Sequence, residues 1–165
     1  MIFIDNQIQI SLDDYLESLK KAADFHGHLC PGIFNGVKMS LLAKGLMKFK
    51  EFPNQDLIVV SEIDRCLTDA VMAVTGCRFG RRTLKFRDWG KFAATFCSIE
   101  IKEGLRIVLR DGVYTEITKT IRDRGIDPLS REAVGKIYLE YPWQKHFNIE
   151  NVDAFFDASD LPGFR

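Results

Sequence analysis

The segment from His26 to Gly32 constrains this chain more than any other, because it concentrates metal-ligating side chains between two helical patterns. In an extended backbone alternate side chains point to the same side, so His26, His28 and Cys30 would face one way. Pro31 suits the first position of a helix, which places Cys30 at a helix N-terminus, where the helix dipole favours a thiolate. Neutral imidazole and thiolate suit zinc first, and nickel or iron next. We therefore predict that these three side chains bind a transition metal.

Hydrophobic periodicity along the rest of the chain predicts a single α+β domain over residues 1–165: an antiparallel sheet with helices packed against it. Helices are expected at residues 12–25, 31–49 and 68–75, and strands at residues 57–63, 83–87, 92–101 and 105–110. Asp111-Gly112 is interpreted as the turn of a tight hairpin. The last part of the chain is expected to form a helical C-terminal arm over about residues 127–165.

Charge and hydropathy exclude several classes of protein. The chain has 23 basic and 23 acidic residues, no formal net charge and a pI of about 6.8. This balance gives no general attraction to nucleic acids or membrane surfaces, so we expect neither as a partner. The N-terminus lacks a basic segment followed by an apolar run, and no stretch approaches the ~20 apolar residues that cross a bilayer. We expect a cytoplasmic protein.

The remaining cysteines are candidates for completing the metal site. Cys66 and Cys77 flank the third expected helix, and a fully helical segment of this length would separate them by roughly 16 Å, so one ion could not bind both within one chain. Cys66, at a strand-to-helix junction, is the better partner for Cys30. Cys77 could contribute from a loop or from the other protomer of a dimer. Each of the two thiols could instead be a small buried apolar side chain, as we expect for Cys97.

A basic loop at residues 75–82 contains two glycines and suggests anion binding. Its backbone N–H groups, with the guanidinium groups of Arg78 and Arg81, could hold the carboxylate or phosphate of a small ligand. A charged run of this kind is also typical of a solvated surface.

Two further residues would matter if the metal activates a water molecule. Lys91 or Asp69 would then act as the acid or base. Lys91 is otherwise interpreted as a solvated lysine. Asp69 could instead orient an imidazole ligand, a role that Glu62 and Asp64 could also fill.

Four ordered motifs resemble those of the FmdE family, which is named after a component of formylmethanofuran dehydrogenase. They are Phe25-His26-Gly27-His28-Leu29-Cys30-Pro31-Gly32, Asp64-Arg65-Cys66-Leu67-Thr68-Asp69-Ala70-Val71, Thr75-Gly76-Cys77 with Gly80, and Asp88-Trp89-Gly90-Lys91-Phe92-Ala93. The resemblance covers about residues 12–110. It implies an α+β core, an intertwined homodimer and a metal near the His/Cys motif. No cysteine follows Cys97, so the chain is similar to members that lack the C-terminal zinc ribbon.

The resemblance leads to a functional hypothesis with two alternatives. The chain is expected to be an accessory, metal-handling or sensing component related to the molybdenum or tungsten formylmethanofuran dehydrogenases of one-carbon metabolism, with such a dehydrogenase as a partner. The first alternative is a stand-alone metalloenzyme acting on a small anionic substrate. The second is a structural dimerisation module.

Overall fold

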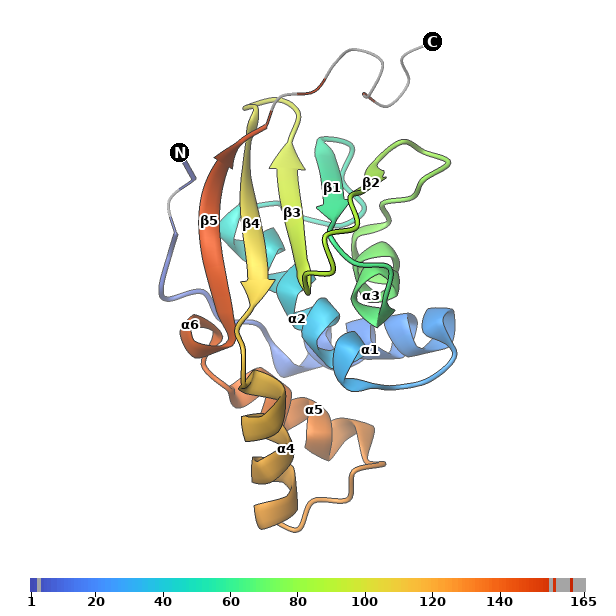
Figure 1. Cartoon of the computed structure of the whole chain (residues 1–165), viewed down its shortest axis with the longest axis vertical. Coiled ribbons are helices and arrows are strands. Elements are labelled where there is room, and N and C mark those ends of the chain that lie inside the picture. Colours follow the sequence, from blue (N-terminus) through green and yellow to red (C-terminus); the bar gives the residue numbers. More distant parts are fainter. Residues whose placement is uncertain (3, 155, 157–160, 162–165) are drawn as a thin grey trace.

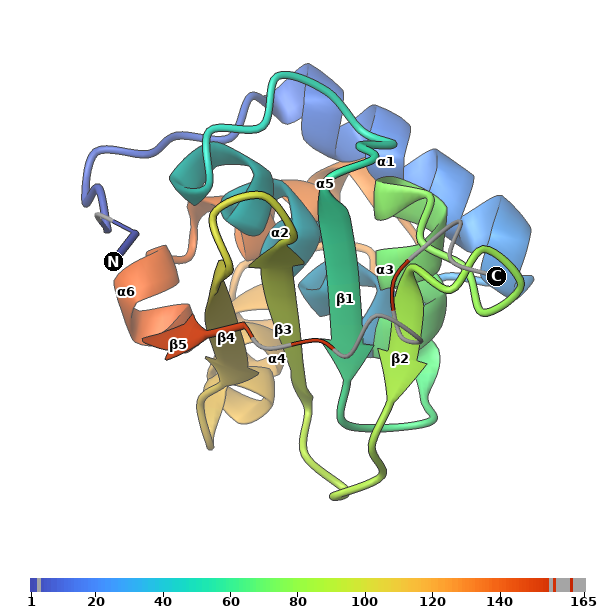
Figure 2. The ribbon, with the colours of Figure 1, turned by 90° about the horizontal axis from the view of Figure 1, so that it is seen from above.

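The computed structural model describes residues 1–2, 4–154, 156 and 161, which form an α+β fold around a five-stranded sheet. The strands are β1 (Leu57–Ser61), β2 (Leu84–Phe86), β3 (Ala93–Ser98), β4 (Glu103–Leu109) and β5 (Phe147–Asp153), in the spatial order β2-β1-β3-β4-β5. The helices are α1 (Leu12–His26), α2 (Pro31–Leu46), α3 (Cys66–Thr75), α4 (Val113–Asp123), α5 (Arg131–Glu140) and α6 (Trp143–His146). Helices α1, α2 and α3 lie on one side of the sheet (Figures 1 and 2).

The sheet is mixed, so the prediction of an antiparallel sheet was wrong at one edge. Strands β1 and β3, β3 and β4, and β4 and β5 pair antiparallel, whereas β2 pairs with β1 in parallel, with Val59 opposite Leu84. Helix α3 lies between β1 and β2 in the chain and carries it back to the end of the sheet where β1 began. A crossover of this kind is what a parallel pair requires.

Helices α2 and α3 pack closely because two glycines of α2 face α3. A Cβ atom built on Gly36 would lie 2.6 Å from the Cβ atom of Ala70, and one on Gly32 would lie 2.6 Å from that of Cys66. The sequence left open whether Gly36 marks close packing, and the structure shows that it does. Helix α2 is buried on almost all sides, as its apolar composition predicted.

The C-terminal part of the chain differs from the predicted helical arm. Residues 131–140 and 143–146 are helical, but Phe147–Asp153 forms strand β5 at the sheet edge, with Leu109 opposite Phe147 and Glu103 opposite Asp153. The strand follows from pairing with the free edge of β4, which local periodicity does not reveal. Residues 155, 157–160 and 162–165 of the predicted arm lie outside the described residues.

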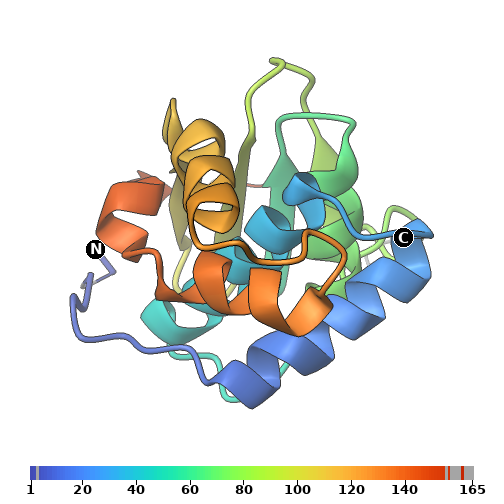
Figure 3. The same cartoon turned by 90° about the horizontal axis from the view of Figure 1, so that it is seen from below.

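The predicted hairpin at Asp111-Gly112 was also wrong, because the turn leads into a helix. Gly112, with φ of 81°, precedes α4, and the chain then forms α5 and α6 before it returns to the sheet as β5. Helices α4 and α5 extend away from the sheet, below the first turns of α2 (Figures 1 and 3). No helix among the described residues combines the length and the apolar character that crossing a membrane requires.

Candidate metal centre

The segment between α1 and α2 brings three ligand side chains together. Helix α1 ends at His26, since Gly27 adopts a left-handed conformation with φ of 99°, which glycine reaches without strain. Cys30 then precedes Pro31 as the N-cap residue of α2. One ligand atom from each of His26, His28 and Cys30 lies within 4.8 Å of the other two. The convergence results from a helix end and a tight turn rather than from the extended backbone that we assumed.

Asp69 fixes the orientation of the first of these imidazoles. It lies in the first turn of α3, and its Oδ2 atom is 2.7 Å from Nδ1 of His26. A carboxylate accepts from Nδ1–H, so the lone pair of a neutral imidazole is then on Nε2. This is how protein carboxylates commonly hold a metal-ligating histidine. Of the three acidic residues considered from the sequence, Asp69 is the one that contacts an imidazole of the group.

The remaining nitrogen of His26 is the clearest sign of a missing partner. Its Nε2 atom is buried and has no hydrogen-bond partner among the described residues. Buried polar atoms in folded proteins are nearly always paired, so an unpaired one calls for an explanation. The ring of His28 lies 4.6 Å from that of His26, centroid to centroid, with the planes inclined by 38°. A metal ion bound at Nε2 would satisfy the buried atom, so the donor set fits such an ion.

Cys66 adjoins this group from the start of α3. As the first residue of that helix it is beside Gly32, and its Sγ atom lies 3.5 Å from where a Cβ atom on Gly32 would be. Burial is the main reason why the pKa of the Cys66 thiol is raised, and a hydrogen bond with Cys30 and the charge of Cys30 raise it further. Two neighbouring thiols repel each other once ionised, whereas a bound cation would stabilise both thiolates.

A cavity opens beside the group on the α3 side. It has a volume of about 450 Å³, and among its lining residues are His26, Cys66 and Asp69. Phe79 and Phe86 contribute apolar surface to the same cavity. The ligand atoms are therefore reachable from outside, as a site with an open coordination position requires.

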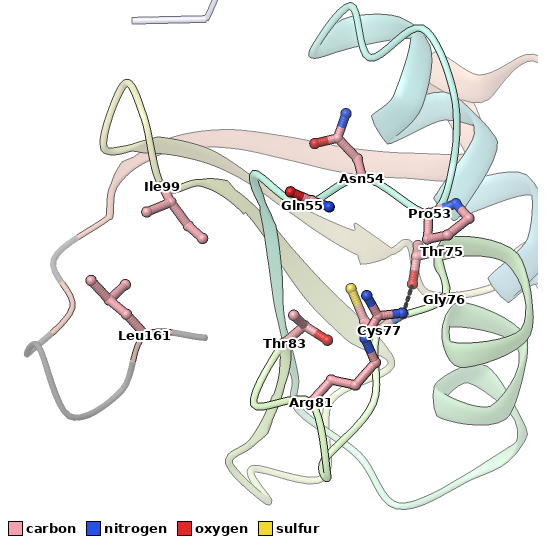
Figure 4. A pocket seen from close by; sticks show the side chains of 10 residues that line it. All are labelled: Pro53, Asn54, Gln55, Thr75, Gly76, Cys77, Arg81, Thr83, Ile99 and Leu161. Carbon is pink, nitrogen blue, oxygen red and sulfur yellow. Dashed lines mark hydrogen bonds between the residues drawn. The ribbon is translucent and has the colours of Figure 1, made fainter. Parts of the chain in front are cut away.

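Cys77 and Arg81 lie at the other end of α3, apart from the three-residue group. Helix α3 runs from Cys66 to Thr75, so Cys77 follows its C-terminus. The Cys77 thiol is 3.9 Å from the carbonyl oxygen of Leu57, and burial raises its pKa. Arg81 and Cys77 line a separate cavity of about 390 Å³ (Figure 4). Within one chain the structure thus brings Cys66, and not Cys77, next to Cys30.

The other residues proposed for anion binding or catalysis are engaged elsewhere. The Arg78 guanidinium donates to the carbonyl oxygens of Met72 and Cys77, and it stacks on the ring of Phe25 at 5.1 Å. It therefore caps the C-terminal end of α3 and is not free to hold an anion. Lys91 is exposed and does not line the cavity beside His26.

Glu62, considered as a possible partner of an imidazole, has a different role. Its side chain is 1 % exposed, and its carboxylate accepts two hydrogen bonds from Arg106, at 2.6 and 2.7 Å. The pair links the end of β1 to β4 across the sheet. Glu62 is therefore a structural residue of the sheet and does not contact the ligand group.

Sequence analysis missed a buried polar network between α2 and α6. Lys38, which is 2 % exposed, donates to the carbonyl oxygens of Tyr138 and Tyr141 at the end of α5, and its Nζ atom is 3.1 Å from Nδ1 of His146. Nε2 of His146 is 2.6 Å from Oδ1 of Asn35. The signal present in the sequence was a lysine and an asparagine inside a helix that is otherwise apolar.

The fold and the site together define a class: an α+β domain in which helix ends around a mixed sheet carry a His/Cys ligand group. The family model "FmdE, Molybdenum formylmethanofuran dehydrogenase operon" matches residues 25–148, which cover both the site and the sheet. The chain belongs to the FmdE family. This agrees with the family indicated by the sequence motifs.

One solved structure and one curated protein are similar to this chain. The structure is that of an FmdE-like protein of tungsten formylmethanofuran dehydrogenase from Syntrophus aciditrophicus, with a TM-score of 0.64 and 25% sequence identity over 90% of this chain and 78% of that one. The curated relative is a "Probable S-adenosyl-L-methionine-binding protein" from Archaeoglobus fulgidus, 36% identical over 93 residues. These residues are 54% of this chain but 25% of the relative, so the match spans only a quarter of that protein.

Proposed function

We propose that this FmdE-family chain binds a transition metal, zinc first, through His26, His28 and Cys30, with Cys66 as the adjoining thiol. The observation that carries the proposal is the buried, unpartnered Nε2 atom of His26, whose imidazole is held in place by Asp69. Two imidazoles with one or two thiolates form a set of donors suited to zinc, nickel or iron. A bound ion would supply a Lewis acid or a fixed positive charge at this point.

The test is the metal content of the purified protein. Wild type, Cys30→Ser and Cys97→Ala are produced side by side, and metal per chain is measured by mass spectrometry after removal of loosely bound ions. Cys97 is the matched control, since it is a buried thiol on β3, outside the ligand group. We expect the ion in wild type and in Cys97→Ala and its loss from Cys30→Ser, with all three proteins folded by circular dichroism. Equal metal content in wild type and Cys30→Ser would refute the proposal.

The biological role that we propose is that of an accessory, metal-handling or sensing component working with a molybdenum- or tungsten-dependent formylmethanofuran dehydrogenase. Membership of the FmdE family and the similar FmdE-like structure support it. The chain would act as a homodimer. Light scattering during gel filtration tests the dimer, and co-elution with a purified formylmethanofuran dehydrogenase tests the partnership. A monomer that elutes alone under both conditions would contradict this role.

A second candidate function is the binding of S-adenosyl-L-methionine, which the name of the curated relative suggests. The supporting observation is the 36% identity over 93 residues of this chain. Calorimetric titration of the metal-loaded protein with S-adenosyl-L-methionine tests it directly. Absence of a saturable heat signal would remove this candidate and leave the metal proposal standing.

A further inference from the structure

A second cavity, on the opposite side of the ligand group, lies between the segment that joins α1 to α2 and the helices α4 and α5. Its volume is about 470 Å³, and it is lined by His28 and Cys30 as well as by residues of α2, α4 and α5. Helices α4 and α5 pack against each other and α5 packs against α1 and α2, which places them over this side of the group (Figure 3). The cavity walls are mostly apolar and include Phe34, Ile121 and Val134. Ligand pockets of small molecules are typically of this size and character.

A tyrosine hydroxyl group in the wall of this cavity has no protein partner. The side chain of Tyr138 is 2 % exposed, and its ring stacks on Phe34 with the centroids 4.8 Å apart and the planes 9° apart. Its hydroxyl makes no hydrogen bond with a described residue, unlike that of Tyr15, which donates to the carbonyl of Phe34. Burial raises the pKa of Tyr138, and the nearby Tyr114 and Cys30, which line the same cavity, raise it further. The hydroxyl therefore lies near Cys30, where a polar group of a ligand would pair with it.

The mouth of the cavity is positively charged. Arg131, the first residue of α5, is its only lining arginine or lysine, and no acidic residue lines it among the described residues. Arg131 forms no ion pair in the part of the chain that the structure describes. Two apolar side chains at the rim, Leu129 and Tyr114, are 88 % and 53 % exposed. An anionic group bound at Arg131 would be attached to a body that covers this apolar surface.

We propose that this cavity binds a small organic carboxylate with an aromatic or aliphatic body. The carboxylate pairs with Arg131, the body lies against Phe34 and Val134, and a hydroxyl at the far end meets Tyr138 beside Cys30. The proposal rests on the proposed function only in placing a metal ion next to that far end. The cavity, its charge and its unpartnered hydroxyl do not depend on the ion.

A fluorescent hydroxynaphthoate is a suitable probe, because it carries a carboxylate and a hydroxyl at opposite ends of an aromatic body. Its binding is measured by fluorescence titration, with naphthol, which lacks the carboxylate, and naphthoate, which lacks the hydroxyl, as comparison probes. We expect one saturable site in wild type. Removing a charge-assisted hydrogen bond should weaken binding about ten-fold or more, so naphthol should bind that much less tightly.

Three variants test the placement of the probe. Arg131→Met should weaken hydroxynaphthoate about ten-fold and leave naphthol unchanged. Arg124→Met is the matched control, because Arg124 is also an exposed arginine of this region but pairs with Glu140, 3.7 Å away, and it should change nothing. Tyr138→Phe should weaken hydroxynaphthoate and not naphthoate.

The same preparations separate this inference from the metal proposal. Each titration is run on protein stripped with a chelator and on metal-loaded protein, with the metal content measured in parallel. Probe binding without any bound metal in wild type would support the cavity and refute the metal site. Metal binding without saturable probe binding would overturn the cavity proposal alone. Equal affinities in wild type and Arg131→Met, or in wild type and Tyr138→Phe, would overturn it as well.

Discussion

Acid should destabilise this protein through His146, which is fully buried at the end of α6. Its Nδ1 atom faces the ammonium group of Lys38 at 3.1 Å, and its Nε2 atom faces Oδ1 of Asn35 at 2.6 Å. The neutral ring fits these neighbours, since Nδ1 accepts from Lys38 and Nε2–H donates to Asn35. A protonated ring would direct a second N–H group at a cation. Burial, and then the charge of Lys38, lower the pKa of His146 to about 2.

The size of the effect follows from the difference between the folded and unfolded states. In the unfolded chain the pKa of a histidine is about 6.5, so between pH 6.5 and about 2 the unfolded state binds a proton that the folded state excludes. Stability therefore falls as the pH falls below 6.5, by about 1.4 kcal/mol for each pH unit. Between pH 6.5 and 4.5 the loss from His146 is about 2 to 3 kcal/mol.

The assay compares wild type with His146→Gln by urea denaturation at pH 6.5 and pH 4.5. Glutamine can accept from Lys38 and donate to Asn35 but does not titrate, so the contributions of all other groups are shared by the two proteins. The free energy of unfolding should fall by about 2 to 3 kcal/mol more in wild type than in the variant over this range. An equal loss in both proteins would show that His146 is not held neutral and would refute the reasoning.

Two further predictions concern the metal centre and the helix interface. Asp69→Asn should weaken metal binding about 10- to 100-fold in a competition with a chelating dye, because the amide no longer fixes the ligating imidazole; Asp64→Asn, an exposed control on the loop before α3, should bind normally. Gly36→Ala should lower the free energy of unfolding by about 1 to 3 kcal/mol, because its Cβ atom would lie 2.6 Å from that of Ala70. Gly80→Ala, whose Cβ atom would meet nothing within 4 Å, should change stability little in the same denaturation experiment. Normal dye competition by Asp69→Asn, or equal unfolding midpoints for the two alanine variants, would contradict the respective argument.

The parts of the fold that sequence analysis predicted are those with local signals. The hydroxyl of Ser11 caps the start of α1, Pro31 begins α2, and Gly76, with φ of 74°, ends α3 as expected. Strand β5 was missed because residues 147–153 become a strand through pairing with β4, more than 30 residues earlier in the chain. The parallel position of β2 was missed for a similar reason, since strand direction is set by the crossover and not by composition.

The candidate site divides in the same way. The convergence of His26, His28 and Cys30 could be anticipated, because all three lie within five residues. The choice of Asp69 as the partner of His26 could not, since the two are 43 positions apart and other acidic residues were equally plausible. Arg78 could not be assigned from sequence either, because the carbonyl groups that it caps are exposed only by the end of α3.

The route of the chain between β4 and β5 separates two parts of the molecule that selection could alter independently. The chain leaves the sheet after Leu109 and returns at Phe147, its direct neighbour across the strands, so residues 110–146 form an excursion anchored at adjacent points. Insertions or exchanges within this excursion would reshape the wall above Cys30 without shifting strand register or the turn that gathers the imidazoles. Modular variation of this kind offers a way to change organic ligands around a constant inorganic centre.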